Sequence, residues 1–115
     1  VIAASKKVDD LRQLECWEDL NCDGDEIRRY LGTVGTSSPL FLLEKALKAL
    51  LPDLDMDALP DLEETTGAIR QADFLAYSTI FAIGSGGLDP RPYMADCLKQ
   101  VERLQKDLRI WAKAV

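Results

Sequence analysis

A short acidic run carries the most specific chemical pattern in the chain. Residues 19–24 read Asp-Leu-Asn-Cys-Asp-Gly, matching the first six positions of a calcium-binding loop. The twelfth position should supply a bidentate carboxylate but is Tyr30, and Glu26 stands at the usually apolar eighth position. We therefore favour a turn, in which Asn and Asp side chains accept backbone hydrogen bonds, and we predict no resident metal ion or other cofactor. The alternative is a small calcium-stabilised module with three ligands: Asp19, Asn21 and Asp23.

Three cysteines, Cys16, Cys22 and Cys97, leave two redox interpretations open. One bridge plus one free thiol fits an oxidising compartment, and three free thiols fit a reducing one. If a bridge forms, we favour Cys16–Cys22, which requires the helix to end between them, because a continuous helix would separate them by about 9 Å of rise. Cys97 falls on the apolar stripe of a predicted helix, so we expect a buried thiol without a cationic activator.

Catalytic groups are missing from the sequence. The chain has no histidine, which excludes the usual general base and the Ser–His and Cys–His pairs. The glycine-rich residues 84–87 follow a predicted helix and lack the Gly-Lys-Ser/Thr of a phosphate loop, so they indicate a helix end and a link. The carboxylates between residues 53 and 64 are typical of a solvated acidic loop. We predict no catalytic residues and no enzyme activity.

Charge is distributed unevenly along the 115 residues. The net charge of -6 argues against a nucleic-acid partner. Residues 1–64 carry 15 acidic and 7 basic side chains, whereas residues 65–115 carry 5 acidic and 7 basic ones. Electrostatic docking on a partner is the role we assign to five basic residues: Lys6, Lys7, Lys99, Arg103 and Lys106. No apolar run approaches the length of a membrane span, and the absence of an initial methionine suggests a processed form.

Apolar periodicity predicts an all-α single domain. Helices are expected over residues 5–20, 25–31, 39–51, 61–83 and 90–114, with a linker over 52–60. Ser38 and Pro39 are expected to open the helix over 39–51. Four principal helices and the short helix over 25–31 predict an antiparallel four-helix bundle with an up-down-up-down order and a short extra helix.

The predicted helix over 61–83 is apolar on two sides. Its core-facing side is expected to hold small and aliphatic residues: Ile69, Ala72, Ala76, Thr79, Ile80 and Ile83. On the opposite side Phe74, Tyr77 and Phe81 recur at i, i+3 and i+7. We favour a central helix buried on both faces. The alternative is an exposed patch that docks a partner protein.

Two stretches of the chain resemble the PsbQ-like extrinsic subunits of photosystem II. Residues 17–20 (Trp-Glu-Asp-Leu) and 27–31 (Ile-Arg-Arg-Tyr-Leu) are similar to the family's tryptophan-bearing first helix and its continuation. Residues 69–73 and 92–104 resemble its last helix pair, including the tyrosine that opens the final helix. The turn at residues 21–24 and the lack of a proline-rich N-terminal arm depart from the family pattern, which suggests a divergent member.

The resemblance implies a noncatalytic role in the thylakoid lumen of a plastid. The expected partners are the photosystem II core and its other extrinsic subunits, and the protein would be peripheral to the membrane and monomeric when free. It would shield the oxygen-evolving centre and help retain calcium and chloride. The oxidising lumen would also favour the bridge between Cys16 and Cys22.

Overall fold

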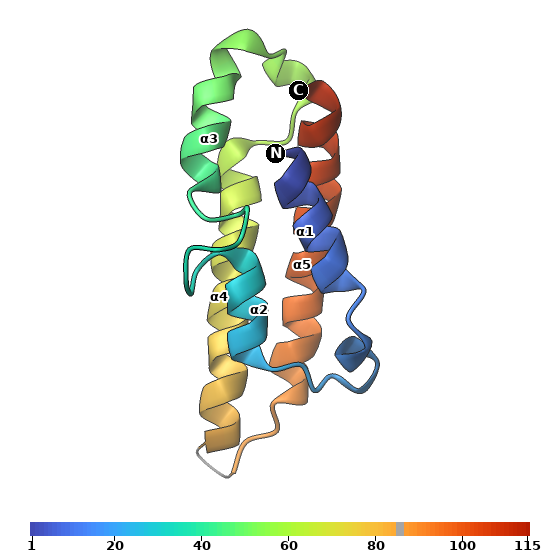
Figure 1. The fold of residues 1–115 in the computed structure, drawn as a ribbon. Helices are drawn as coiled ribbons and strands as arrows, with labels where there is room; N and C mark the ends of the chain where they lie inside the picture. Colours follow the sequence, from blue (N-terminus) through green and yellow to red (C-terminus); the bar gives the residue numbers. More distant parts are fainter. Residues whose placement is uncertain (85–86) are drawn as a thin grey trace.

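A computed structural model describes residues 1–84 and 87–115, and all the regular secondary structure in these residues is helical. This confirms the all-α prediction. The helices shown in Figure 1 are α1 (Ile2–Arg12), α2 (Gly24–Leu31), α3 (Leu43–Leu50), α4 (Leu62–Gly84) and α5 (Arg91–Ala114). Three short 3₁₀ segments make up the rest of the helical structure in the described residues: η1 (Glu15–Asp19), η2 (Leu51–Asp53) and η3 (Met56–Ala58).

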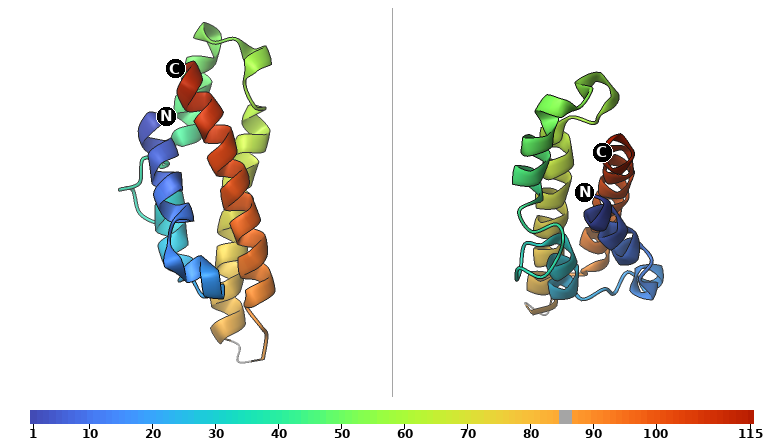
Figure 2. Two further views of the ribbon diagram at one scale, coloured as in Figure 1. Left: turned by 90° about the vertical axis from the view of Figure 1, so that its right-hand side faces the viewer. Right: turned by 45° about the horizontal axis from the view of Figure 1, so that its top comes forward.

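The two longest helices, α4 and α5, form an antiparallel hairpin along the length of the molecule (Figure 1). Helix α1 lies along α5, and α2 lies along α4. Helix α3 follows α2 toward the same end of the molecule and lies beside the first turns of α4 (Figures 1 and 2). The result is an elongated body of 50 × 24 × 21 Å with both termini toward one end.

The core forms where the apolar stripe of α5 meets the other helices. The apolar stripe predicted to hold Cys97 contains six buried residues: Met94, Cys97, Val101, Leu104, Leu108 and Trp111. Tyr93 and Val115, which continue this stripe toward its two ends, are exposed. Trp111 is fully buried, and its Nε1 donates a hydrogen bond to Thr65 Oγ1 at 3.4 Å. The indole therefore gains apolar burial without leaving its donor unpaired.

The predicted first helix over residues 5–20 is wrong at its C-terminal end. Helix α1 ends at Arg12, Leu14 adopts an extended conformation, and η1 follows as a separate segment. Trp17 Nε1 donates a hydrogen bond of 2.8 Å to Leu11 O, which lies at the end of α1. Leu11 O also accepts from Leu14 N at 3.3 Å, so Trp17 replaces the N–H of Glu15 that a continuing helix would have supplied, and periodicity alone could not locate the break.

The helix predicted over residues 39–51 begins later than expected. Residues 38–42 form turns, and α3 starts only at Leu43. Ser38 Oγ accepts from Leu40 N at 3.2 Å and donates to Tyr30 O, so it caps a turn that is tied to α2. A Cβ at Gly32, whose φ is +77°, would lie 2.5 Å from Phe41 N. This close crossing of two backbone segments fixes the turn and delays the helix.

The remaining helix predictions agree with the structure to within one or two residues. Helices α2, α4 and α5 occupy the expected segments, and the expected linker over 52–60 is irregular apart from η2 and η3. Helix α4 extends to Gly84, one residue beyond the predicted end at Ile83. Residues 85 and 86 of the glycine-rich segment lie outside the described residues.

Candidate docking surface

Three aromatic side chains of α4 point away from the core. Phe74, Tyr77 and Phe81 are 62%, 53% and 64% exposed, so the favoured expectation that α4 is buried on both faces is wrong. They line a shallow pocket of about 340 Å³ with Ser78, with Leu88 of the α4–α5 link and with Tyr93 of α5. We call Phe74, Tyr77, Phe81, Leu88 and Tyr93 the aromatic surface.

The exposure follows from the small residues on the opposite side of α4. Ala72, Ala76 and Thr79 are fully buried there. A Cβ at Gly24, the first residue of α2, would lie 2.4 Å from Ala76 O, and Cys97 Sγ on α5 lies 3.4 Å from Ala72 O. Both neighbouring helices therefore pack closely on the small-residue face. The aromatic side of α4 stays exposed apart from the Arg28 side chain of α2, which lies against the Tyr77 ring.

The expected core-facing side of α4 is correct only in part. Ile69 and Ile80 are half-buried, but Ile83 is 65% exposed, so its assignment to the core is wrong. The reason is the position of α2, which begins at Gly24 opposite Ala76 and Ile80. Ile83 lies about one turn beyond that contact, where α2 no longer covers α4.

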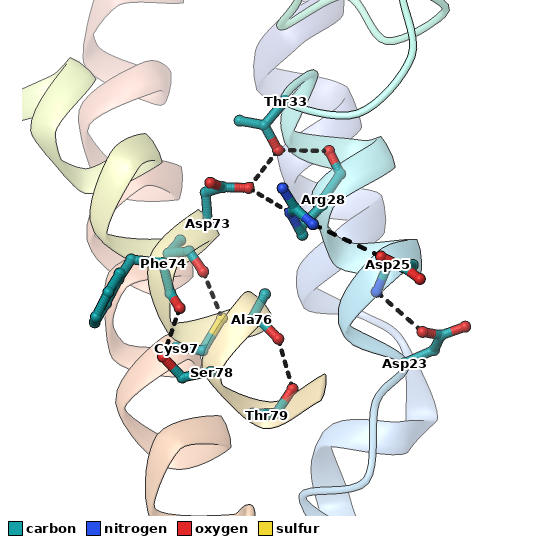
Figure 3. A network of polar contacts seen from close by, with 11 residues as sticks. Asp23, Asp25, Arg28, Thr33, Asp73, Phe74, Ala76, Ser78, Thr79 and Cys97 are labelled. Atoms are coloured by element: carbon teal, nitrogen blue, oxygen red, sulfur yellow. Dashed lines mark hydrogen bonds and ion pairs between the residues drawn. The ribbon is translucent and has the colours of Figure 1, made fainter. Parts of the chain in front are cut away.

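A polar network ties one edge of the aromatic surface to α2 (Figure 3). Asp73 Oδ1 accepts from Arg28 Nε at 2.8 Å and from Thr33 Oγ1 at 2.6 Å. The Arg28 guanidinium also lies 5.2 Å from the centre of the Tyr77 ring, a cation–π distance. Arg28 therefore links α2 to both a carboxylate and an aromatic ring of α4, and it holds Tyr77 in place.

Cys97 lies behind this surface between α4 and α5. Burial, with a smaller contribution from the negative charge of Asp73, raises the pKa of the Cys97 thiol to about 12. The thiol is therefore protonated at neutral pH and contacts the Ala72 carbonyl as a weak donor. This agrees with the expected structural role of a buried thiol.

The acidic run at residues 19–24 forms a disulfide-linked turn. A disulfide joins Cys16 and Cys22, with a Cα–Cα distance of 4.8 Å, while Cys97 stays free. Asp23 caps α2, and its Oδ1 accepts from Asp25 N at 2.9 Å. Across residues 1–84 and 87–115, no three histidine, cysteine, aspartate or glutamate side chains gather into a group that could hold a metal ion.

The five basic candidates do not gather at the aromatic surface. Two of them pair with acidic side chains: Lys99 lies 3.8 Å from Asp96, and Arg103 lies 3.5 Å from Glu64. Lys7 Nζ lies 4.4 Å from the centre of the Tyr30 ring. Lys6 and Lys106 are exposed.

The contacts between α1 and α5 show that α1 lies far from the aromatic surface. On α1, Asp9 Oδ1 accepts from Gln105 Nε2 at 2.8 Å and lies 3.1 Å from Arg109 Nη2. Gln105 is twelve residues from Tyr93, which corresponds to about 18 Å of helix. Lys6 and Lys7 precede Asp9 on a helix whose first residues lie toward the opposite end from the α4–α5 link (Figure 1). They therefore belong to a different part of the molecular surface.

Sequence reasoning missed two components of the aromatic surface. Tyr93 joins it because α4 and α5 form a hairpin, which places residues on either side of its link next to each other, and Leu88 lies in the link itself. The predicted antiparallel order of the helices already implied that residues next to this link would be neighbours. The pairing of Arg28 with Asp73, across 45 residues, had no local signal.

Comparisons with protein-family models, with curated proteins and with solved structures found no match to this chain. Within the described residues, none of the helices combines the length and the apolar character needed to cross a membrane.

Proposed function

We propose that this protein is a noncatalytic extrinsic subunit that docks on the lumenal side of photosystem II. There it shields the oxygen-evolving centre and helps to retain calcium and chloride. The observation that carries the docking role is the aromatic surface, because clustered exposed aromatic side chains are characteristic of protein interfaces. The photosystem itself is proposed from the resemblance of residues 17–20, 27–31, 69–73 and 92–104 to PsbQ-like subunits.

The helix arrangement is compatible with this proposal. We propose that α2 and α3 act together as one broken helix, so that α1, α2–α3, α4 and α5 correspond to the four helices of the expected up-down-up-down bundle. The short extra helix is then the first half of the second bundle helix. Tyr93, which opens the final helix in the resemblance, belongs to the aromatic surface.

In this proposal the aromatic rings and the cations have separate tasks. Phe74 and Phe81 bury large apolar areas against the partner and supply most of the binding free energy. The exposed cations Lys6 and Lys106 steer the approach to an anionic face, which affects the association rate more than the affinity. The disulfide between Cys16 and Cys22 fits the oxidising lumen.

Reconstitution tests the proposal. Photosystem II membranes stripped of extrinsic subunits by salt should bind the purified protein saturably. Oxygen evolution at low calcium and chloride should then rise. Absence of saturable binding to the stripped membranes, with the protein folded, would refute the proposed partner.

A separate pair of variants tests the docking role that we assign to Lys6 and Lys7. Replacing Lys6 and Lys7 by glutamate should weaken rebinding, and the effect should shrink at high salt because screening removes the electrostatic attraction. The matched control replaces Lys45 and Lys48 on α3 by glutamate, which changes the net charge equally and should leave rebinding unchanged. Equal weakening by both pairs would show that net charge alone, rather than the position of Lys6 and Lys7, controls binding.

A further inference from the structure

A second apolar depression lies on the other half of α4 and differs from the aromatic surface in its polar groups. It is an open groove of about 430 Å³ between the end of α2, the turn before α3, α3 itself and α4. Buried Leu31, Leu40 and Leu43 line it, together with half-buried Ile69. Three cations also line it: Lys45, Lys48 and Arg70. We call this depression the cationic groove.

Charge in the cationic groove is only partly compensated. Lys48 Nζ lies 3.5 Å from Glu44 Oε1, which is the only anionic side chain in the lining. Lys45 and Arg70 belong to different helices, α3 and α4, and neither forms an ion pair with any residue that the structure describes. The lining therefore carries three positive charges and one negative charge, a net charge of +2. An anionic group lying between α3 and α4 would compensate the two unpaired cations.

The other polar side chains of the groove already have partners in the chain. Thr66 Oγ1 donates to Leu62 O at 3.0 Å. Thr33 Oγ1 donates to Asp73 Oδ1 at 2.6 Å. The hydroxyl groups of Thr33 and Thr66 thus already have hydrogen-bond partners. Lys45 and Arg70 are therefore the polar side chains of the lining that can bind a ligand. Such a lining suits a molecule with an apolar body and a single anionic head rather than one with many hydrogen-bonding groups.

Leu42 gives a second, independent indication of a ligand. Its φ of +62° is a left-handed conformation that costs a leucine about 1 kcal/mol or more, and its side chain is 61% exposed. Burial in the core therefore does not explain why a leucine occupies this position. The side chain instead forms part of the wall of the cationic groove. Contact with an apolar ligand there would bury it.

We propose that the cationic groove binds a single-chain aliphatic carboxylate, such as a medium-chain fatty acid. The chain lies against exposed Leu42 and half-buried Ile69, over a floor of buried leucines, and the carboxylate lies between Lys45 and Arg70. The groove volume falls in the range of about 300–1,000 Å³ typical of small-molecule sites. This site is separate from the aromatic surface, and it does not depend on the proposed docking to photosystem II.

Decanoate at concentrations below its micellar range is the probe, with amide chemical shifts of the ¹⁵N-labelled protein as the readout. Saturable shifts should map to Gly32, Leu43 and Ile69. Decyltrimethylammonium, with the same chain and the opposite charge, should bind at least tenfold more weakly. Equal binding of both probes would overturn the proposal, as would shifts centred on Phe81 or no saturable shift up to several millimolar decanoate. Binding to anionic lipid vesicles without binding of free decanoate would also overturn it.

Two variants separate the contributions of charge and apolar contact. Replacing Lys45 and Arg70 by glutamine should weaken decanoate binding about tenfold, because two partly exposed charge interactions are lost. Leu42→Asn should weaken it about fivefold while preserving the fold, since asparagine tolerates a left-handed backbone. The matched control replaces the exposed α5 residues Lys99 and Lys113 by glutamine and should leave decanoate affinity unchanged. Unchanged affinity in both groove variants would refute the site.

Discussion

The two halves of α4 meet their neighbours in opposite ways. Around Ala72 and Ala76 the backbones of α2 and α5 approach closely, and the large side chains of α4 are left on the outside. Around Thr66 and Ile69, α3 touches α4 much less and leaves the cationic groove. Close packing thus leaves large aromatic side chains exposed on the outer side of α4, whereas an incomplete helix contact leaves a groove between α3 and α4.

This contrast explains why the two sites suit different ligands. The exposed rings of Phe74, Tyr77 and Phe81 offer aromatic contact area to a large partner. The cationic groove combines an apolar lining with Lys45 and Arg70, which suits a small molecule with an anionic head. The direction in which the neighbouring helices pack decides which kind of site forms.

The largest expected effect comes from disturbing the closely packed half. Gly24→Ala should lower the free energy of unfolding by about 3 kcal/mol, because the new Cβ would lie 2.4 Å from Ala76 O, a backbone atom that cannot move aside. Urea unfolding measures this change. Gly67→Ala, in the open half of α4, meets only the end of Arg70 at 3.9 Å and should raise the free energy by about 0.5–1 kcal/mol. Equal effects of the two substitutions would contradict the proposed difference in packing.

The second prediction concerns Cys97 in the closely packed half. Its pKa is raised from 9.0 to about 12, so the unfolded chain loses this proton at lower pH than the folded chain does. The stabilising contribution is complete below pH 9 and declines as the pH rises toward 12. Between pH 9.0 and 10.5, wild type should lose about 2 kcal/mol more unfolding free energy than Cys97→Ala. Parallel pH profiles for the two proteins would show that the thiol is less buried than described.

Thiol counting provides a separate check on the same cysteine. Native protein at pH 8 should not react with a thiol reagent, since Cys97 is buried and protonated. Denatured protein without reductant should show one thiol, and reduced denatured protein should show three. Three thiols without reductant would exclude the bridge between Cys16 and Cys22.

A smaller effect is expected where α2 is tied to the edge of the aromatic surface. Asp73→Asn should lower the free energy of unfolding by about 1 kcal/mol, because the half-buried ion pair with Arg28 is lost while the side-chain shape is retained. It should also broaden the ring resonances of Tyr77, whose position depends on Arg28. Lys48→Gln, which removes the exposed pair with Glu44, should change stability by less than about 0.5 kcal/mol.

The smallest expected change in the free energy of unfolding is an increase, and it comes from a substitution beside the cationic groove. Leu42→Asn should raise the free energy of unfolding by about 0.5 kcal/mol, since the left-handed backbone conformation suits asparagine better than leucine. Chemical denaturation of the ligand-free protein measures it. A clear loss of stability would mean that Leu42 supports the fold and would remove one of the two arguments for the groove.

The local pattern of apolar residues was sufficient to predict α4 and α5, where the apolar period extends over more than twenty residues. It failed at the end of α1, because Trp17 pairs with Leu11 O only after the chain has turned. It failed at the start of α3 as well, because the turn depends on the crossing of Gly32 and Phe41. Both failures involve contacts between segments that no local period contains.

The candidate sites were predictable to different degrees. The spacing of Phe74, Tyr77 and Phe81 identified the aromatic surface, but their exposure was not predictable because both faces of α4 are apolar. Which face is covered depends on the close approach of Gly24 to Ala76. The cationic groove was not predictable, because it exists only where α3 begins late.

The most direct test of the docking role is the affinity of aromatic-surface variants for salt-stripped photosystem II membranes. Phe74→Ser and Phe81→Ser combined should weaken binding at least tenfold and leave the free energy of unfolding within about 0.5 kcal/mol, since both rings are exposed in the free protein. The control, Ile2→Ser with Met56→Ser, removes two equally exposed apolar side chains elsewhere and should bind like wild type. Wild-type affinity of the Phe74 and Phe81 variant would contradict the account.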